Sequence, residues 1–471
     1  MASSSKKQKA SPARIIIDTD PGVDDALAIL LAFGAKSSIV VEGLTIVCGN
    51  GSDIKKLGAN AKFLSRLAGY PNVPVSLGDA PLDDGAGEIP NHVHGEDGLG
   101  NVATELGRTV ADFSGFHSKL AAQFIADTCA AAPGEITLVC IGPLSNLAAA
   151  LALRPDLPQL VREVVIMGGA VHGELRGNRA PAAEANFISD PEAAQAVLTA
   201  GFRSVILADL GITHQTDVCT LREACCKALG SESAMASTIC KFTQAFVDCY
   251  LKTFGAPTAP AHDVVAVMYL IRPELFTKKS ARVEVELQGT LTRGMSVADW
   301  KGKWGKPPNC EVLMTVDAEQ FNAEFVAAMR SLPATMPPPL KHIDKLALVH
   351  VRDRKQLVVR SVGKSAFYTP GGKREAGESD VQALVRECKE ELSVDLKVSS
   401  IEPFGVFRAQ AHGKPEGTMV IMTCFTAEFT GELKEANEIE ELKWIGASEV
   451  ASVSGASALI LQDLKAKGLI D

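Results

Sequence analysis

The sequence lacks several features that would place it in other protein classes. It has no apolar run of about 18 residues, the length that a helix needs to span a bilayer, which argues against an integral membrane protein. It has no excess of positive charge: the net charge of −9 argues against binding to nucleic acid or to an anionic membrane surface. Residues 1–14 lack an apolar core, so we expect a disordered tail over residues 1–12 and not a signal peptide.

The cysteines show no pattern of a disulfide framework or a zinc site. There are eleven, an odd number, and no two of them form a C-x-x-C pair. Scattered cysteines of this kind are typical of reduced, intracellular proteins. We therefore expect free thiols and a cytoplasmic location.

The length of 471 residues predicts at least two domains. One stretch, residues 331–342, interrupts the pattern of alternating apolar and polar segments and contains three consecutive prolines, Pro337 to Pro339. Such a run cannot lie in a helix or a central strand, and it acts as a semi-rigid linker. We expect a first domain at 13–332, a linker at 333–342 and a second domain at 343–471.

Four carboxylates occur within eight residues, in the stretch from Asp18 to Asp25. The β-branched run Ile15–Ile17 before it predicts a buried strand, and the helix formers of 26–33 predict a helix after it. The acids then lie in a strand-to-helix turn, where open α/β sheets bind ligands. An ordinary helix N-cap explains one or two of these acids, whereas four indicate a hard divalent cation with oxygen ligands.

Further apolar runs predict more strands of the same sheet, and polar residues follow several of them. The runs are Ile39–Val47, Ile136–Ile141, Val164–Met167 and Val205–Ala208. With intervening helical segments, they predict an α/β fold with a Rossmann-like, open, mostly parallel sheet.

Polar residues near these strand ends are suited to a polyhydroxylated ligand. Asn50 follows the second run, and its amide both donates and accepts hydrogen bonds; the alternative is a turn asparagine. Asn178, Glu184 and Asn186 cluster after a glycine turn, where the alternative is a polar surface loop.

Two histidines complete the candidate site of the first domain. His94 lies in a glycine-rich polar loop at 92–100, and His262 with Asp263 begins the apolar helical run 264–270. Alone, each is a weak signal. A loop histidine such as His94 is commonly exposed to solvent, and a His–Asp pair is also common.

Taken in order, these motifs resemble the inosine–uridine-preferring nucleoside hydrolases, which cleave the N-glycosidic bond of ribonucleosides. The resemblance covers about 13–330. A rival reading is a haloacid-dehalogenase-like phosphotransferase, in which the first Asp of Asp18-x-Asp20 is the nucleophile, but those enzymes do not need the pair Asp24-Asp25.

The resemblance implies a role for each residue of the candidate site. It implies a homodimer or homotetramer and a site that is broad or pyrimidine-tolerant, because the purine-specific branch lacks the histidine. A histidine with a pKa near 6.5 can protonate a departing base. The implied roles are Ca²⁺ ligation by Asp20, Asp25, the carbonyl of Ile141 and Asp263; general base, Asp24; general acid, His262; ribose contacts, Asn50, Asn178, Glu184 and Asn186; and a base-side residue, His94.

A second set of acids follows the linker. On a helix predicted over 379–392, Glu387, Glu390 and Glu391 share one face. Such a face is either an exposed acidic stripe or a cation site. Together with Gly372, Glu378 and Arg386, the stretch resembles the Nudix box of hydrolases that cleave nucleoside diphosphates linked to another group.

This second resemblance, over about 343–471, implies a small α/β/α sandwich and an Mg²⁺ or Mn²⁺ site. The three helix glutamates would hold the ion, Arg386 would brace Glu378, and Glu438, six residues before Trp444, would be a further ligand. The chain departs from the box at Ser393, where a glycine is usual.

The sequence therefore predicts a bifunctional hydrolase of small-molecule nucleosides and nucleotides. It would release free base from ribonucleosides with Ca²⁺ and hydrolyse a pyrophosphate bond with Mg²⁺. The alternative is a nucleoside-binding regulatory protein in which only one domain is catalytic.

Overall fold

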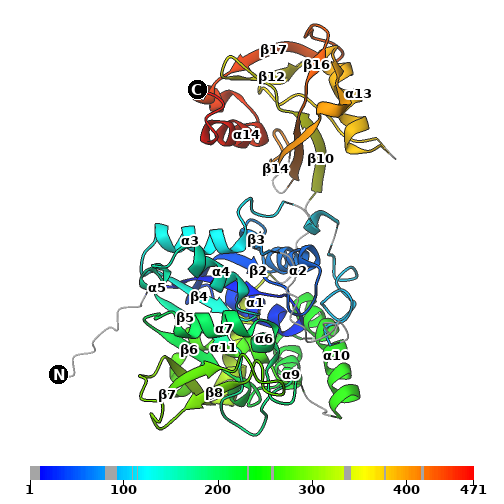
Figure 1. Cartoon of the computed structure of the whole chain (residues 1–471). Coiled ribbons are helices and arrows are strands. Elements are labelled where there is room, and N and C mark those ends of the chain that lie inside the picture. Colours follow the sequence, from blue (N-terminus) through cyan, green and yellow to red (C-terminus); the bar gives the residue numbers. More distant parts are fainter. Residues whose placement is uncertain are drawn as a thin grey trace, which may run out of the picture. The chain divides into compact units, whose positions relative to one another are not determined.

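In a computed structural model, the chain forms two compact units, Met1–Pro337 and Pro338–Asp471 (Figure 1). The structure describes residues 11–79, 93–108, 110–113, 115–230, 233–255, 259–333, 341–375, 378–414 and 418–471. Most of the predicted tail and linker, residues 1–10 and 334–340, therefore lies outside the described residues. In the described parts of the chain, no helix is both long enough and apolar enough to span a bilayer.

The first unit is built on a nine-stranded sheet with the order β3-β2-β1-β4-β5-β6-β9-β7-β8. Neighbours from β3 to β9 pair in parallel, and β7 and β8 add an antiparallel edge. The strands are β1 (Ala13–Thr19), β2 (Ile39–Ile46), β3 (Val75–Leu77), β4 (Ile136–Cys140), β5 (Glu163–Met167), β6 (Val205–Ala208), β7 (Phe276–Val285), β8 (Ser296–Asp299) and β9 (Cys310–Val316).

Helices cover both faces of this sheet (Figure 1). One face packs on α1 (Val23–Gly34), α2 (Ile54–Leu67), α8 (Leu210–Thr213), α9 (Val218–Leu229), α10 (Ala234–Phe254), α11 (His262–Ile271) and α12 (Ala318–Ser331). The other packs on α3 (Ala121–Ala131), α4 (Ser145–Leu153), α5 (Leu157–Leu160), α6 (Ala185–Ser189) and α7 (Pro191–Thr199). Two short 3₁₀ helices are η1 (Val110–Phe113) and η2 (Pro273–Leu275). The predicted Rossmann-like fold is confirmed.

Strand β1 shows why the sequence folds this way. Ile15 and Ile17 join the core on one face of the sheet, and Ile16 joins the core on the other. All three are fully buried, as expected for a strand between two parallel neighbours with helices on both faces. This central position carries the acidic turn after β1 to the carboxyl edge of the sheet.

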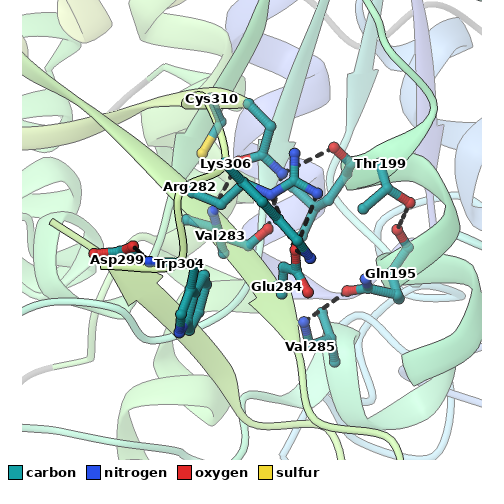
Figure 2. A network of polar contacts seen from close by, with 12 residues as sticks. Gln195, Thr199, Arg282, Val283, Glu284, Val285, Asp299, Trp304, Lys306 and Cys310 are labelled. Carbon is teal, nitrogen blue, oxygen red and sulfur yellow. Dashed lines mark hydrogen bonds and ion pairs between the residues drawn. The ribbon is translucent and has the colours of Figure 1, made fainter. Parts of the chain in front are cut away.

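The antiparallel edge is tied to the rest of the unit by polar contacts, shown in Figure 2. The backbone N–H of Val285 on β7 donates to the side chain of Gln195 on α7, at 2.7 Å. Glu284 of β7 accepts hydrogen bonds from Arg282 and Lys306. These contacts link β7 to α7 and to the segment between β8 and β9, at the end of the sheet that lies farthest from β1.

The second unit contains three small sheets, with strand orders β10-β15-β14, β11-β12-β17 and β13-β16. Its strands are β10 (Lys341–Leu348), β11 (Val351–Arg352), β12 (Lys355–Ser361), β13 (Asp395–Leu396), β14 (Glu402–Gln410), β15 (Thr418–Thr426), β16 (Phe429–Thr430) and β17 (Ile439–Ile445). Its helices are α13 (Asp380–Leu392), η3 (Val398–Ser400), η4 (Ala447–Ser452) and α14 (Gly455–Ala466). Separate apolar clusters form against α14 and against α13, which places the sheets between the two helices.

One expectation about the cysteines is wrong. Cys226 on α9 and Cys240 on α10 form a disulfide, whereas the other nine cysteines form none. The two residues are 14 positions apart in the sequence, and the packing of α9 against α10 brings their side chains together. Sequence spacing alone does not reveal such a pairing.

Candidate functional site

The acidic turn at the end of β1 is buried. Asp20 follows the strand, Gly22 precedes α1, and Asp24 and Asp25 lie in the first turn of that helix, where the helix dipole favours negative charge. No more than 5% of the surface of any of these aspartates is exposed. Asp18 is also buried, but Thr45 and Asn146 hydrogen-bond one of its oxygens.

Asp25 is the best-bonded member of this cluster. Its carboxylate accepts hydrogen bonds from the hydroxyl of Thr19 (2.5 Å), the backbone N–H of Gly22 (3.0 Å) and the side-chain amide of Asn50 (3.0 Å). The backbone N–H of Asn50 also donates to Asp20, at 2.6 Å. Asn50 therefore links Asp20 and Asp25, a contact that the sequence did not indicate.

A fifth acid joins the cluster from the far end of the unit's sequence. Oxygens of Asp24, Asp25 and Asp263 lie within 4.8 Å of one another, with Asp263 in the first turn of α11. Among the described residues, this is the only group of three or more Asp, Glu, His or Cys side chains whose potential metal-binding atoms lie this close together. Helix α1 packs beside α11, which explains how residues so far apart in sequence meet.

The electrostatics of the cluster favour either a bound cation or protonation of its carboxyls. Burial raises the pKa of Asp24 to about 8, with repulsion from Asp25 as the next cause. Burial and neighbouring carboxylates also raise the pKa values of Asp20 and Asp263 well above the usual range. One oxygen of Asp20 and one of Asp24 are buried without a hydrogen-bond partner. The residues present therefore fit a divalent cation with oxygen ligands.

Two glycines let the chain close tightly around Asp20. A Cβ atom at Gly142 would come within 2.6 Å of one Asp20 oxygen, and a Cβ at Gly49 would contact the other. Ile141, just before Gly142, has a backbone carbonyl that accepts a hydrogen bond from the Asn186 side chain, at 3.0 Å. A carbonyl has two lone pairs, so this bond leaves one acceptor position of Ile141 for a cation.

Asn178, Glu184 and Asn186, predicted to contact ribose, occupy the N-terminus of α6 and the loop before it. Glu184 is the N-cap of α6 and accepts hydrogen bonds from the backbone of Asn186, Phe187 and Gly169. Its burial raises the pKa to about 7. Asn186 is buried, whereas Asn178 is exposed and accepts the backbone N–H of Ala185. The hydrogen bond between Asn186 and Ile141 connects this group to the acidic cluster.

The two predicted histidines lie on the other side of the cluster, against helix α10. His94 accepts a hydrogen bond from the backbone of Val23, lies 3.8 Å from Asp24 and stacks on Phe246. The ring of His262 lies between the hydroxyls of Thr213 (2.8 Å) and Tyr250 (3.3 Å). Burial lowers the pKa of His94 to about 4 and that of His262 to about 3. The expectation of a pKa near 6.5 for His262 is therefore corrected, because the ring is enclosed.

Sequence reasoning missed the residues that enclose these histidines. Phe246 and Tyr250 are four positions apart on α10, a spacing that is as common in an ordinary core-facing helix. Thr213 ends the short helix α8, and the adjacent His214 packs edge-on against His262. Only the tertiary structure shows that these side chains face His262.

In the second unit, α13 carries the predicted Nudix residues. Arg386 forms two hydrogen bonds with Glu378 (2.8 and 2.9 Å) and ion pairs with Glu387 (2.8 Å) and Glu390 (3.4 Å). Its bonds to Glu378 lower the pKa of that carboxyl to about 2. The arginine thus neutralises much of the acidic face of α13.

Glu391, on the same helix, lines a cavity of about 190 Å³. It accepts the backbone N–H of Gly371 at 2.8 Å, and burial raises its pKa to about 7. Glu438 and Lys345 line the same cavity. A Cβ atom at Gly372 would collide with the carboxylate of Glu387, so any other residue here would displace that carboxylate.

The fold and the site define an α/β protein with a buried acidic centre at the carboxyl edge of a mostly parallel sheet. Residues 15–323 match the family model "inosine-uridine preferring nucleoside hydrolase", and residues 342–464 match the model "NUDIX domain". The chain belongs to the inosine–uridine preferring nucleoside hydrolase family and carries a C-terminal Nudix domain. It is an enzyme that combines a nucleoside hydrolase, or N-glycosidase, with a Nudix hydrolase.

Individual relatives and solved structures resemble the first unit. Uridine nucleosidase 1 of Arabidopsis thaliana is 37% identical over 331 residues, which cover 68% of this chain and 94% of that protein. The inosine-uridine preferring nucleoside hydrolase of Leishmania major is 36% identical over 328 residues, covering 68% and 98%. The structure of a plant nucleoside hydrolase aligns with a TM-score of 0.60 at 30% identity, over 68% of this chain and 99% of that one.

Proposed function

We propose that the first unit hydrolyses the N-glycosidic bond of ribonucleosides to ribose and free base, with Ca²⁺ as cofactor. The observation that carries the proposal is the buried cluster of Asp20, Asp24, Asp25 and Asp263, in which two oxygens lack partners. Asp20, Asp25, Asp263 and the carbonyl of Ile141 would hold the ion. A bound cation would supply the charge that orients the ribose diol and a water molecule.

In this proposal, the chain's own residues carry out the proton transfers. Asp24 takes the proton of the attacking water, since one of its oxygens has no other partner. His262, held between Thr213 and Tyr250, donates a proton to the base as it leaves. Because burial lowers the pKa of His262 to about 3, the ring must take up a proton when substrate is bound before it can protonate the leaving base, and its two nitrogens lie beside the hydroxyls of Thr213 and Tyr250.

Substrate contacts come from both sides of the cluster. Asn50, Asn178, Glu184 and Asn186 bind ribose hydroxyls, and His94 lies beside the base. We infer that uridine and other pyrimidine nucleosides are accepted, since several relatives of the first unit are named uridine nucleosidases. Charge develops on the ribose as the bond breaks, so the contacts that hold the sugar promote the reaction by orientation.

We propose that the second unit hydrolyses a pyrophosphate bond in a nucleoside diphosphate derivative, with Mg²⁺ or Mn²⁺. Glu387, Glu390 and Glu391 would bind the ion, with Glu438 as a further ligand from the same cavity as Glu391. Gly372 leaves room for Glu387, and Arg386 braces Glu378. Binding of the cation would replace the ion pairs that Arg386 makes with the acids of α13.

The proposal includes the domain limits 13–332 and 343–471, a cytoplasmic location and a homodimer or homotetramer. The test uses the full chain with purine and pyrimidine ribonucleosides, in the presence of Ca²⁺ or a chelator, together with Asp24→Asn. Chelator-sensitive release of base that the substitution abolishes supports the first activity. In parallel, phosphate-ester products from nucleoside diphosphate derivatives are measured with and without Mg²⁺. Turnover by one unit alone would favour the regulatory alternative.

A further inference from the structure

The disulfide between α9 and α10 lies where it can act on the nucleoside site. Helix α10 presents two different faces to its surroundings. Cys240 faces α9, where its sulfur joins Cys226. Phe246 and Tyr250, on another face of α10, reach His94 and His262. These two rings form an aromatic wall on the base side, the part of the site that is proposed to bind the nucleobase. The position of α10 therefore determines whether this wall is complete.

Helix α9 is fixed to the segment that carries His262. The backbone N–H of Val218, its first residue, donates to the carbonyl of Ala259 at 2.8 Å. The backbone N–H of Ala259 donates in turn to Asp217, the N-cap of α9, at 3.2 Å. Residues 259–261 lead directly into α11 and its His262. The disulfide thus ties the wall on α10 to a helix that is anchored beside the catalytic segment.

Polar contacts at the surface also involve α10. Arg222 of α9 donates to Gln244 of α10, and Lys241 pairs with Glu105; both contacts are exposed. Exposed polar contacts of this kind contribute little to stability. Met235, Ile239 and Phe242 also hold this half of α10 by packing in the core, and the covalent link adds a restraint to that packing.

The two bonded cysteines are accessible to a reagent. Cys226 and Cys240 are half-buried, whereas the neighbouring Cys225 is fully buried and its pKa is raised by burial to about 12. Thiol–disulfide exchange requires that a thiolate reach one of the two sulfurs. The bonded pair meets this condition, and Cys225 does not compete for it.

We propose that Cys226–Cys240 is a thiol–disulfide exchange site that sets how firmly α10 closes the base side of the nucleoside pocket. Its reaction partner is a dithiol reductant. One thiolate of the dithiol attacks a sulfur, forms a mixed disulfide and releases the other cysteine as a thiolate, which takes up a proton. The second thiol of the reductant then displaces the remaining cysteine, so that two electrons and two protons reach the chain and the reductant leaves as a disulfide.

This proposal rests on the proposed nucleoside site for its effect on catalysis. Reduction removes the covalent restraint on the start of α10, so we expect Phe246 and Tyr250 to spend less time against the histidines. We expect KM for uridine to rise about 5-fold or more on reduction, a typical strength of coupling between two sites, with a smaller change in kcat. Oxidation by a small disulfide is expected to restore the lower KM.

The test compares the full-length protein after treatment with dithiothreitol and after oxidation with glutathione disulfide. Alkylation of free thiols followed by mass spectrometry reports the state of each cysteine. Steady-state kinetics with uridine and hydrogen–deuterium exchange of peptides from α10 are measured on both forms. The variant C226S/C240S is expected to behave like the reduced enzyme in both treatments, and C249S, which changes a cysteine of the same helix outside the disulfide, is expected to respond like the wild type.

Two results would overturn the proposal: alkylation of Cys226 and Cys240 in the oxidised protein, or the same exchange rates for α10 in the two forms. An unchanged KM with a changed α10 would refute the link to the nucleoside pocket. If neither form cleaves any nucleoside, the proposed function fails, and the exchange rates still decide whether the disulfide holds α10.

Discussion

Replacing Asp24 with asparagine should make the first unit more stable while abolishing its activity. In the folded protein burial raises the pKa of Asp24 from 3.8 to about 8. Between these two values, the folded state holds a proton that the unfolded state has lost. The contribution of Asp24 is therefore most favourable below pH 3.8 and is lost as the pH rises toward 8.

The magnitude follows from this shift. Without a bound cation, the native carboxyl at position 24 costs about 1.5 kcal/mol at pH 5 and about 4 kcal/mol at pH 7. An asparagine does not titrate. However, one oxygen of Asp24 is buried without a hydrogen-bond partner, and an amide placed there would also have an unpaired polar atom, which costs about 1–3 kcal/mol of stability. We expect the free energy of unfolding of Asp24→Asn to exceed that of the wild type by about 1–3 kcal/mol at pH 7 with chelator present. The difference between variant and wild type should grow by about 2.5 kcal/mol from pH 5 to pH 7, because the amide cost does not depend on pH.

The assay is hydrogen–deuterium exchange of β1 and β4, which reports the free energy of unfolding of the first unit without interference from the second. Asp156→Asn, at an exposed aspartate that pairs with Arg154, serves as the control and should show no pH-dependent gain. An Asp24→Asn protein that is less stable than the wild type by the same amount at both pH values would refute the reasoning, since it would mean that folding does not raise the pKa of Asp24.

Further predictions concern the metal, the leaving group and the second unit. Ca²⁺ at 100 times its Kd should stabilise the first unit by about 2.7 kcal/mol, measured by the same exchange; no shift would argue against a cation in the cluster. His262→Ala should lower kcat for uridine about 10²- to 10⁴-fold but slow a nitrophenyl riboside much less, because a good leaving group needs no proton; equal losses would contradict the acid role. Gly372→Ala should abolish Mg²⁺-dependent hydrolysis and leave nucleoside cleavage intact, because a Cβ there collides with Glu387; the exposed Lys389→Ala on α13 is the control, and retained activity would disprove the collision. Ser393→Gly should stabilise the second unit by about 1 kcal/mol in urea denaturation, because Ser393 has a left-handed backbone with φ of 61°; a loss of stability would show that its side chain offsets this strain.

The sequence was most informative where local patterns and tertiary position agree. The apolar runs that became β1, β4, β5 and β6 are almost entirely buried, so their composition marks them as strands; β2 is buried only in its second half. The acids after β1 predicted a cation because like charges so close in sequence remain close in any fold. The Nudix helix was likewise visible from its spacing, and α13 spans Asp380–Leu392 where 379–392 was expected.

The sequence was least informative where contacts join distant segments. Tyr250, Phe246 and Thr213 enclose the histidines, but each has an ordinary role in a helix when its own neighbourhood is considered. The pairing of Cys226 with Cys240 depends on the angle between two helices, which no local pattern contains. The low pKa of His262 has the same origin, because its burial is produced by α8 and α10 and not by its sequence neighbours.

The strand order of the first unit has a consequence for its synthesis. Strand β9, the last of the sheet in the chain, lies between β6 and β7, so neither can complete its pairing until residues 310–316 have left the ribosome. Strand β1 likewise waits for β4, more than a hundred positions later, with one apolar edge unpaired. Such long-range pairing is slow, and open strand edges favour aggregation. The nascent chain therefore depends on protection of these edges, and a chain that stops before Cys310 should accumulate as an open, aggregating intermediate.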